Sequence, residues 1–334
     1  MKNRFLNVGI IQQTITENPI ENLKLWEEAL TKLMASYHKP ELVIGVETIT
    51  PFYSEVIPEG PLCVYFSSLA KKYGIYLIPG TIGETFEGKL YNTAIFFNPK
   101  GEFIGKYRKM APWYPAESHV TPGNIEDNMQ IFEIPEKRTK IGIQICYDIN
   151  FPEISRNQAL LGAEVLVKLT MDPEELRLTN DPFHEVRAIE NQAFLVCTNG
   201  VGQFLENSLY GHSMVVNPEG KRIWEASHTP TTSCITLDLD QVTRCRQYGT
   251  LFLDHYLKHV KSFNIKRLYN ENVSDAPLYK DLSNPPKNTE EYQKTISQEL
   301  GLIGYDNVFE TNFPDAITQM QEYLNEMRSG DYEE

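Results

Sequence analysis

Four polar residues of this sequence stand at points where a predicted strand ends, namely Glu47, Lys109, Glu117 and Cys146. Acyl transfer from a carbon–nitrogen bond needs a nucleophile, a base that takes its proton, and a positive charge where the carbonyl oxygen becomes an oxyanion. A thiol, two carboxylates and an ammonium group can supply all three. These residue types therefore predict chemistry at a carbonyl carbon, provided that the fold brings the four side chains together.

The stretch Lys140–Arg156, with the sequence KIGIQICYDINFPEISR, has Cys146 at its centre. Its alternating isoleucines at 141–145 predict a strand that ends near the cysteine, and Pro152 begins a helical pattern. The thiol is therefore predicted on a strand-to-helix turn, where free backbone N–H groups and the positive end of a helix favour a thiolate. The alternative interpretation is a small buried apolar side chain, as most free cysteines are.

Each of the other three residues also has an ordinary interpretation. Glu47 follows the apolar run Leu42–Val46 and could be paired structurally, since a carboxylate is seldom buried without a partner. Lys109 could be the solvated end of a basic patch, and Glu117 could be an exposed acid of a loop. Because the three occur together with Cys146, we favour the catalytic interpretation.

Helical and strand patterns alternate through most of the chain. Asn18 and Pro19 begin a helix that apolar spacing continues to about Tyr37, and Gly74 ends a second helix. We predict strands at 5–11, 42–46, 75–82, 164–169 and 193–199, and helices at 62–73, 152–162 and about 182–192. Such alternation places helices on the outside of sheets.

Two segments of the chain are similar to each other, LYNTAIFFNPKGEFI at 90–104 and LYGHSMVVNPEGKRI at 209–223. In each, the proline presets one turn dihedral and the glycine tolerates a positive one, so both segments predict hairpins. Only two copies occur, about 120 residues apart, which indicates two half-domains of similar topology rather than a solenoid.

The pattern weakens after Leu239, and we divide the chain into a main domain at 1–263, ending in a predicted helix at 250–263, and an acidic extension at 264–334. Residues 265–334 hold six Lys or Arg against fourteen Asp or Glu, a net charge of −8, and include an amphipathic helical pattern at Phe313–Met327. Because the extension retains apolar residues, we expect it to pack on the core or, by preference, on a neighbouring subunit. A solvated acidic tail is the alternative.

Composition excludes several classes of function. A formal charge of −14 without a basic stripe argues against nucleic acid and against an anionic membrane surface as partners. No apolar run approaches membrane-spanning length, and the first residues predict a strand rather than a signal peptide. The five cysteines lack CxxC spacing, which argues against a disulfide framework and a zinc site and indicates a reducing compartment. We therefore expect a cytoplasmic protein.

With their neighbours, the four polar residues resemble the motifs of the nitrilase superfamily of carbon–nitrogen hydrolases. The similar segments are VIGVETITPF around Glu47, KYRKMAPWYPAE with Lys109 and Glu117, IQICYDINFPEISR around Cys146, and HEVRAIENQAFLVCTN at 184–199. They span roughly residues 5–240, in the family's order and spacing. Within the family, PWYPAE is similar to the loop of aliphatic amidases and formamidases.

The resemblance implies an α/β fold, a four-layer α-β-β-α sandwich, whose units pair through their outer helices into a homo-oligomer, a dimer or higher. By it, Cys146 would attack the substrate carbonyl, Glu47 would take the thiol proton and later activate water, and an acyl-thioester would form. Lys109 and the Tyr147 backbone N–H would hold the oxyanion, and Glu117 would position the substrate amide. No metal or cofactor is implied.

Residues near Glu117 and Cys146 are candidates to shape the pocket. Trp113, Tyr114 and His119 lie beside Glu117, with loop packing as the alternative interpretation. Thr48 and Tyr147 stand where the similar amidases carry an aromatic residue and an acid or histidine, respectively, so the accepted acyl group stays open.

The hypothesis we favour is an amidase that hydrolyses a small uncharged amide to a carboxylate and ammonia. A nitrilase or an N-carbamoyl amide hydrolase would use the same residues, and a catalytically inactive scaffold would keep the same fold. A glutamine-dependent amidotransferase subunit is less attractive, because no ATP-binding loop follows residue 240.

Overall fold

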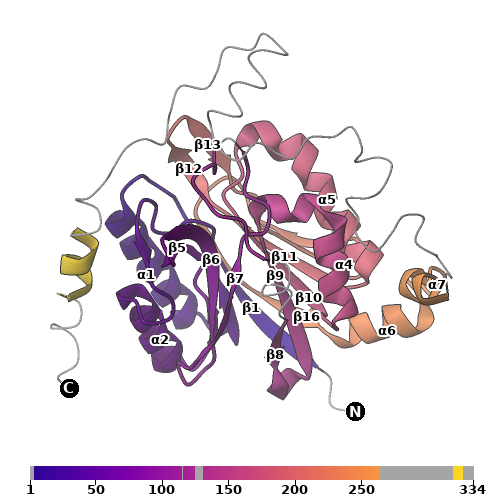
Figure 1. Ribbon diagram of the computed structural model, residues 1–334. Coiled ribbons are helices and arrows are strands. Elements are labelled where there is room, and N and C mark those ends of the chain that lie inside the picture. The colour runs from indigo at the N-terminus through magenta and orange to yellow at the C-terminus, as the bar shows by residue number, and fades with distance from the viewer. Residues whose placement is uncertain (1–3, 115, 125–130, 263–318, 326–334) are drawn as a thin grey trace, which may run out of the picture.

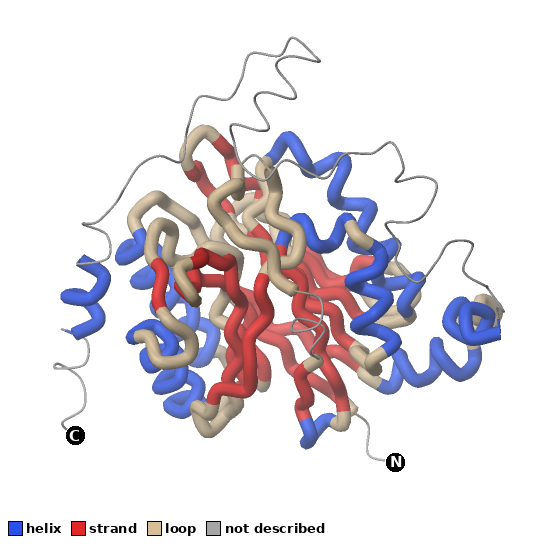
Figure 2. Tube along the Cα trace, viewed as in Figure 1, coloured by secondary structure: helices blue, strands red, loops and turns tan. Residues whose placement is uncertain are grey.

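Four layers of secondary structure make up the protein. The computed structural model describes residues 4–114, 116–124, 131–262 and 319–325. Two β-sheets face each other in the middle, and helices cover the outer face of each sheet (Figure 1). Figure 2 shows the same arrangement, with the strands lying between two groups of helices. The predicted α-β-β-α sandwich is therefore confirmed.

The first sheet contains β1 (Phe5–Gln12), β2 (Leu42–Ile44), β3 (Ser54–Glu55), β4 (Tyr76–Ile78), β5 (Thr81–Phe86), β6 (Lys89–Phe97), β7 (Phe103–Arg108) and β16 (Thr231–Asp238). Its strand order is β16-β1-β2-β4-β6-β5-β3, with β7 paired to β6. Strands β1, β2 and β4 are parallel neighbours, and β6 and β7 form the predicted hairpin around Asn98–Gly101. The carboxyl ends of β1, β2 and β4 therefore lie at one edge of the sheet.

The second sheet contains β8 (Phe132–Ile134), β9 (Thr139–Ile145), β10 (Val165–Thr170), β11 (Phe194–Asn199), β14 (Met214–Val216) and β15 (Arg222–Glu225). Its order is β15-β14-β11-β10-β9-β8, with β9, β10 and β11 parallel and β14-β15 forming the second predicted hairpin. Strands β12 (Val201–Phe204) and β13 (Asn207–Tyr210) form a separate ribbon.

A continuous apolar core separates the two sheets. The alternate isoleucines of β9 point into it, together with side chains of β1, β2, β6 and β10, and those at its centre are fully buried. Strand β10 is buried on both faces, because Val167 contacts this core while Leu166 packs under the outer helices. This explains why β10 has consecutive apolar residues at Val165–Val167 rather than an alternating pattern.

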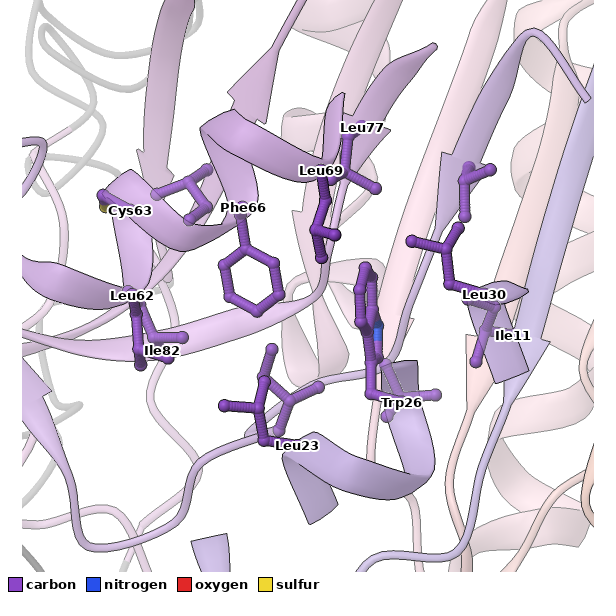
Figure 3. Packing of buried hydrophobic residues seen from close by; sticks show 14 of the residues in the cluster. Ile11, Leu23, Trp26, Leu30, Leu62, Cys63, Phe66, Leu69, Leu77 and Ile82 are labelled. Carbon is purple, nitrogen blue, oxygen red and sulfur yellow. The ribbon is translucent and has the colours of Figure 1, made fainter. Parts of the chain in front are cut away.

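Helices α1 (Pro19–Ala35) and α2 (Pro61–Tyr73) cover the first sheet. As predicted, the Asn18 side chain caps α1 by accepting the backbone N–H groups of Ile20 and Glu21, and Gly74 ends α2 in the left-handed conformation. Trp26 and Phe66 meet edge to face with ring centroids 5.0 Å apart. Figure 3 shows them packed among leucines and isoleucines of the helices and the sheet.

The second sheet is covered by α4 (Pro152–Leu160) and α5 (Arg177–Asn191), and the chain continues into α6 (Asp240–Tyr248) and α7 (Tyr256–Ser262). Short 3-10 helices occur at η1 (Pro135–Lys137), η2 (Cys146–Asn150) and η3 (Glu174–Leu176). The buried Arg187 of α5 donates Nε–H to the carbonyl of Ile149 at 2.9 Å and Nη2–H to that of Asn150 at 3.2 Å. This arginine therefore secures the turn that carries Cys146.

Several predicted boundaries were wrong. The helix predicted at about 182–192 begins at Arg177, because Pro182 lies inside the helix rather than at its start. The strand predicted at 42–46 ends at Ile44, and the helix predicted at 152–162 ends at Leu160. The strand predicted at 75–82 is split into β4 and β5 by Pro79 and Gly80. Helix α1 ends at Ala35, which leaves Tyr37 fully exposed. The helix predicted at 250–263 starts only at Tyr256, after a turn that follows Gly249 with its positive φ of 90°.

Part of the acidic extension is described. The helix predicted at Phe313–Met327 is seen as helix at 319–325, and the rest of that range and 264–312 lie outside the described residues. Met320 and Leu324 are buried against the core cluster under α1, and Lys24 of α1 lies 5.2 Å above the ring of Tyr323. This segment therefore packs on its own chain, beside α1 (Figure 1).

None of the helices in the described part of the chain combines the length and apolar character that a membrane span requires.

Candidate active site

Glu47 is held in place by a close approach of two backbone segments. After β2 the chain passes against the turn between β4 and β5. A Cβ at Gly45 would lie 1.9 Å from the carbonyl oxygen of Pro79, and one at Gly80 would lie 2.1 Å from that of Val46. Only glycine permits this approach. The two glycines therefore fix the backbone that carries Glu47.

The Glu47 carboxylate is 3% exposed and accepts three hydrogen bonds. Oε1 accepts from Lys109 Nζ at 2.9 Å and from Asn92 Nδ2 at 2.8 Å, and Oε2 accepts from the backbone N–H of Met171 at 3.0 Å. Burial raises the pKa of Glu47, and the ammonium of Lys109 opposes this shift without cancelling it. Glu47 is therefore suited to accept a proton from a neighbour.

Lys109 follows β7 and its side chain is 1% exposed. Its backbone N–H donates to the carbonyl of Asn92 at 2.8 Å, and its Nζ lies 2.6 Å from Glu117 Oε2 as well as 2.9 Å from Glu47 Oε1. Burial alone would lower the pKa of Lys109, but the neighbouring Cys146, Glu117 and Glu47 groups raise it well above its ordinary value. The surroundings of this buried amine therefore favour its charged form, and that charge acts on the Cys146 sulfur.

Glu117 lies on the loop after Lys109 and connects that loop to the buried cluster. Its Oε2 also accepts the backbone N–H of Trp113 at 2.7 Å, and its Oε1 accepts from Asn92 Nδ2 at 3.2 Å. With 18% of its side chain exposed, Glu117 is more accessible than Glu47. It therefore lies between the buried pair and the outside of the site.

Cys146 stands at the predicted strand-to-helix turn. Strand β9 ends at Ile145, the 3-10 helix η2 starts at Cys146, and α4 follows from Pro152. Cys146 has a backbone φ of 49°, in the left-handed region that residues other than glycine rarely adopt. Such a turn places a nucleophile above the carboxyl edge of a sheet.

Asp148 joins the Cys146 turn to the Lys109 segment. Its fully buried carboxylate accepts the backbone N–H groups of Ile145 at 3.0 Å, Met110 at 3.2 Å and Ala111 at 2.8 Å, and the Tyr107 hydroxyl at 2.8 Å. Burial raises its pKa to about 6 although these donors favour the charged form. In the sequence Asp148 was only an interruption of a strand pattern, and its burial could not be predicted from that.

The sequence analysis expected the turn to favour a thiolate, but the surroundings of Cys146 act in the opposite direction. Burial and the negative charge of Glu47 raise the pKa of Cys146 well above its ordinary value, and the Lys109 ammonium does not compensate. The N-terminus of α4 does not lie directly at Cys146 in the chain, because α4 begins six residues later, at Pro152. These surroundings favour the thiol over the thiolate, and a thiol would need a base such as Glu47 to take its proton.

A second pair of buried charges was missed by the sequence analysis. Asp172 Oδ1 accepts the hydrogen bond of the Cys146 thiol at 3.3 Å, and Asp172 Oδ2 accepts that of Lys168 Nζ at 2.6 Å. His184 Nε2 lies 3.4 Å from the same Nζ. Lys168 interrupts the apolar residues of β10. A lysine inside a buried strand could have indicated that this pair of charges is present.

Asn92 was also missed. It donates Nδ2–H to both Glu47 and Glu117 and thereby orients the two carboxylates around Lys109. In the sequence it was one residue of a predicted hairpin, at 90–104. Its position on β6, opposite the end of β7, gives it this role.

The predicted pocket residues lie around this cluster. Trp113 and Tyr114 are partly buried on the Glu117 loop, and burial together with the Glu117 charge raises the pKa of Tyr114. Burial lowers the pKa of His119. The Tyr147 ring packs edge to face on Phe151, with centroids 5.2 Å apart. Their roles in binding stay predictions.

The structure therefore brings Glu47, Lys109 and Glu117 into one hydrogen-bonded cluster, and the charges of Glu47 and Lys109 act on the Cys146 sulfur. The cluster holds a carboxylate that can accept a proton, a cation that can stabilise a developing oxyanion, and a further carboxylate, while the thiol itself donates to Asp172. These are the groups that acyl transfer requires.

Comparison with known sequences gives a consistent result. The family model described as carbon-nitrogen hydrolase matches residues 7–247. The omega-amidase NIT2 of Xenopus tropicalis is 32% identical over 214 residues, which cover 59% of this chain and 73% of the relative. The hydrolase C26A3.11 of Schizosaccharomyces pombe is 30% identical over 261 residues, covering 71% of this chain and 77% of the relative.

Solved structures share the fold. Nit3 of Saccharomyces cerevisiae, a member of branch 10 of the nitrilase superfamily, superposes with a TM-score of 0.67 at 26% identity, covering 73% of this chain and 94% of that one. The amidase of Nesterenkonia sp. AN1, in a mutant with the acetamide moiety of fluoroacetamide added at the active-site cysteine, gives a TM-score of 0.62 at 21% identity, covering 74% and 95%.

Proposed function

Because the chain belongs to the carbon-nitrogen hydrolase family, we propose that it is a cysteine amidase that converts a small amide to a carboxylate and ammonia. The observation that supports this most directly is the buried Glu47–Lys109 pair, whose charges act on the Cys146 sulfur. A structural ion pair alone would not require a thiol at its side. The named amidases among the relatives agree with this chemistry.

In the first half of the proposed reaction, Cys146 Sγ bonds to the amide carbonyl carbon while its proton passes to Glu47. The carbonyl electron pair moves to the oxygen, where the Lys109 ammonium stabilises the negative charge. When the carbon–nitrogen bond breaks, Glu47 returns the proton to the leaving nitrogen. Ammonia departs and an acyl-thioester stays on Cys146.

In the second half, a water molecule attacks the thioester carbonyl and gives a proton to Glu47. The carbon–sulfur bond breaks and the sulfur regains the proton from Glu47. The product leaves as a carboxylic acid, and its remaining proton passes in solution to the released ammonia, which leaves a carboxylate and ammonium. One residue thus serves as base and acid in both halves, which requires a carboxylate whose pKa is raised toward the working pH. The burial of Glu47 supplies that shift.

The test follows ammonia release from formamide, acetamide, propionamide and butyramide by the wild type and by Cys146→Ala. We expect release by the wild type and none above background by the variant. Cys234→Ala is the matched control, because it removes a partly buried thiol on β16, at the opposite edge of the first sheet from the hairpin of Lys109. Equal release by wild type and Cys146→Ala would refute the mechanism.

The same assay separates the other functions. Faster turnover of propionitrile or of an N-carbamoyl amine than of any amide would identify a nitrilase or a carbamoyl hydrolase. An inactive scaffold would turn over none of them. Size-exclusion chromatography with light scattering tests the proposed homo-oligomer, and fractionation of the native cell tests the proposed cytoplasmic location.

A further inference from the structure

Asp172 lies directly against the proposed nucleophile and is rigidly held there. It follows β10, its side chain is 1% exposed, and its backbone N–H donates to Asn199 Oδ1 at 2.9 Å. Lys168 Nζ binds its Oδ2 at 2.6 Å, while its Oδ1 faces the Cys146 thiol at 3.3 Å. One oxygen is thus anchored to the protein, and the other borders the reacting sulfur.

The reaction removes the thiol donor from Asp172. Once Cys146 has given its proton to Glu47 and bonded to carbon, its sulfur can no longer donate to Oδ1. A buried carboxylate oxygen that loses its donor is costly unless another donor replaces it. Lys168 keeps Asp172 ionised, since its ammonium lowers the pKa of that carboxyl against the effect of burial. The group bonded to the sulfur is the one placed to supply a new donor.

The three substituents of the substrate carbon can be assigned to three protein groups. The carbonyl oxygen belongs with Lys109, and the leaving nitrogen belongs with Glu47, which protonates it. The acyl substituent is left for Asp172. We propose, on the basis of the proposed function, that Asp172 selects amides whose acyl group carries an amino group close to the carbonyl. This amino group donates a hydrogen bond to Asp172 Oδ1 in place of the thiol.

The test compares glycinamide with propionamide, which have nearly the same shape and differ in an ammonium against a methyl group. We expect the wild type to favour glycinamide in kcat/KM by about tenfold to a hundredfold, the range of a hydrogen bond to a charged group. The double variant Asp172→Asn with Lys168→Gln removes both charges and leaves no unpaired ion. In it we expect the ratio of kcat/KM for glycinamide to kcat/KM for propionamide to fall about tenfold, whatever the change in propionamide turnover itself.

A purely structural Asp172–Lys168 pair would change both substrates equally. Lack of glycinamide preference in the wild type would overturn the proposal even if the double variant did not fold. An unchanged preference in a folded, active double variant would overturn it as well.

A second measurement does not depend on amidase activity. The rate of Cys146 alkylation is measured by mass spectrometry with 2-bromoethylamine and with iodoacetamide. Each rate is divided by the rate at which the same reagent alkylates glutathione, and the ratio of the two normalised rates is then taken. We expect this ratio to be at least about fivefold higher in the wild type than in the double variant. If no amide is hydrolysed but the ratio falls as expected, the proposed function fails and the role of Asp172 stands. Equal ratios refute the role of Asp172.

Discussion

Replacing Glu47 by Gln tests whether this buried carboxylate is the base. Glutamine keeps the size of the side chain but cannot accept the thiol proton. The amide oxygen can still accept from Lys109 Nζ and Asn92 Nδ2, which contact Oε1 at 2.9 and 2.8 Å. The amide nitrogen then faces the Met171 N–H that now lies 3.0 Å from Oε2, so one donor loses its acceptor.

The expected effects on stability and on rate differ in size. One buried donor without an acceptor costs about 1–3 kcal/mol, and Lys109 keeps a carboxylate partner in Glu117 at 2.6 Å. This is a fraction of the roughly 5–15 kcal/mol that stabilises a domain, so the variant should fold. Loss of a general base typically costs about 10²–10⁴-fold, and we expect kcat for amide hydrolysis to fall by about 10³.

The assay is ammonia release under saturating amide, with the free energy of unfolding measured in urea. Glu55→Gln is the matched control, because Glu55 is a buried carboxylate that caps α2 by accepting the N–H groups of Leu62 and Cys63. We expect the control to lose stability while kcat changes by less than about twofold. A Glu47→Gln variant that folds and retains more than a tenth of the wild-type kcat would refute the assignment of the base.

Three further outcomes are expected. Asp148→Asn should lower the free energy of unfolding in urea by about 3 kcal/mol, because its amide nitrogen would face a buried donor. The variant should also lower kcat, because the link between the Cys146 and Lys109 segments would loosen. An unchanged kcat would contradict the importance of this link. Burial and the Lys168 ammonium lower the pKa of His184 from 6.5 to about 3 in the folded protein. Between about pH 3 and pH 6.5, His184 is therefore protonated in the unfolded chain but not in the folded protein. The free energy of unfolding should therefore fall by about 1.4 kcal/mol per pH unit as pH drops through that window, and equal slopes in wild type and His184→Gln would refute this. Leu324→Ala should lower the free energy of unfolding by about 2 kcal/mol, and no change would mean that the 319–325 helix adds nothing to the core.

The sequence was informative wherever local chemistry determines the structure. The Asn18 cap, the Gly74 helix end and the two hairpins were predicted because each depends on residues within a few positions. The turn at Cys146 was predicted for the same reason, since an alternating strand and a helix-starting proline flank it. Positions of Lys109 and Glu117 relative to the thiol came from the family resemblance rather than from local pattern.

Contacts between distant segments could not be predicted. Asp172 follows an apolar strand, and nothing in its neighbours shows that its carboxylate meets the Cys146 thiol, 26 positions away. Asn92 is 45 positions from Glu47 and orients it through one hydrogen bond. The raised pKa of Cys146 was missed for a related reason, because burial depends on how completely the two sheets close around the sulfur.

The site is divided between the two sheets, and this division explains why so many buried charges occur there. Glu47 and Lys109 come from the first sheet, and Cys146 and Asp172 come from the second. Polar contacts cross between them, from Glu47 to the Met171 N–H and from Asp148 to the segment after β7. Reacting groups must approach within about 3–3.5 Å, so in the proposed mechanism the packing of the two sheets sets the distance between the thiol and its base. Each buried charge in this low-dielectric layer has an opposite charge or several donors, and removing one partner therefore affects fold and chemistry together.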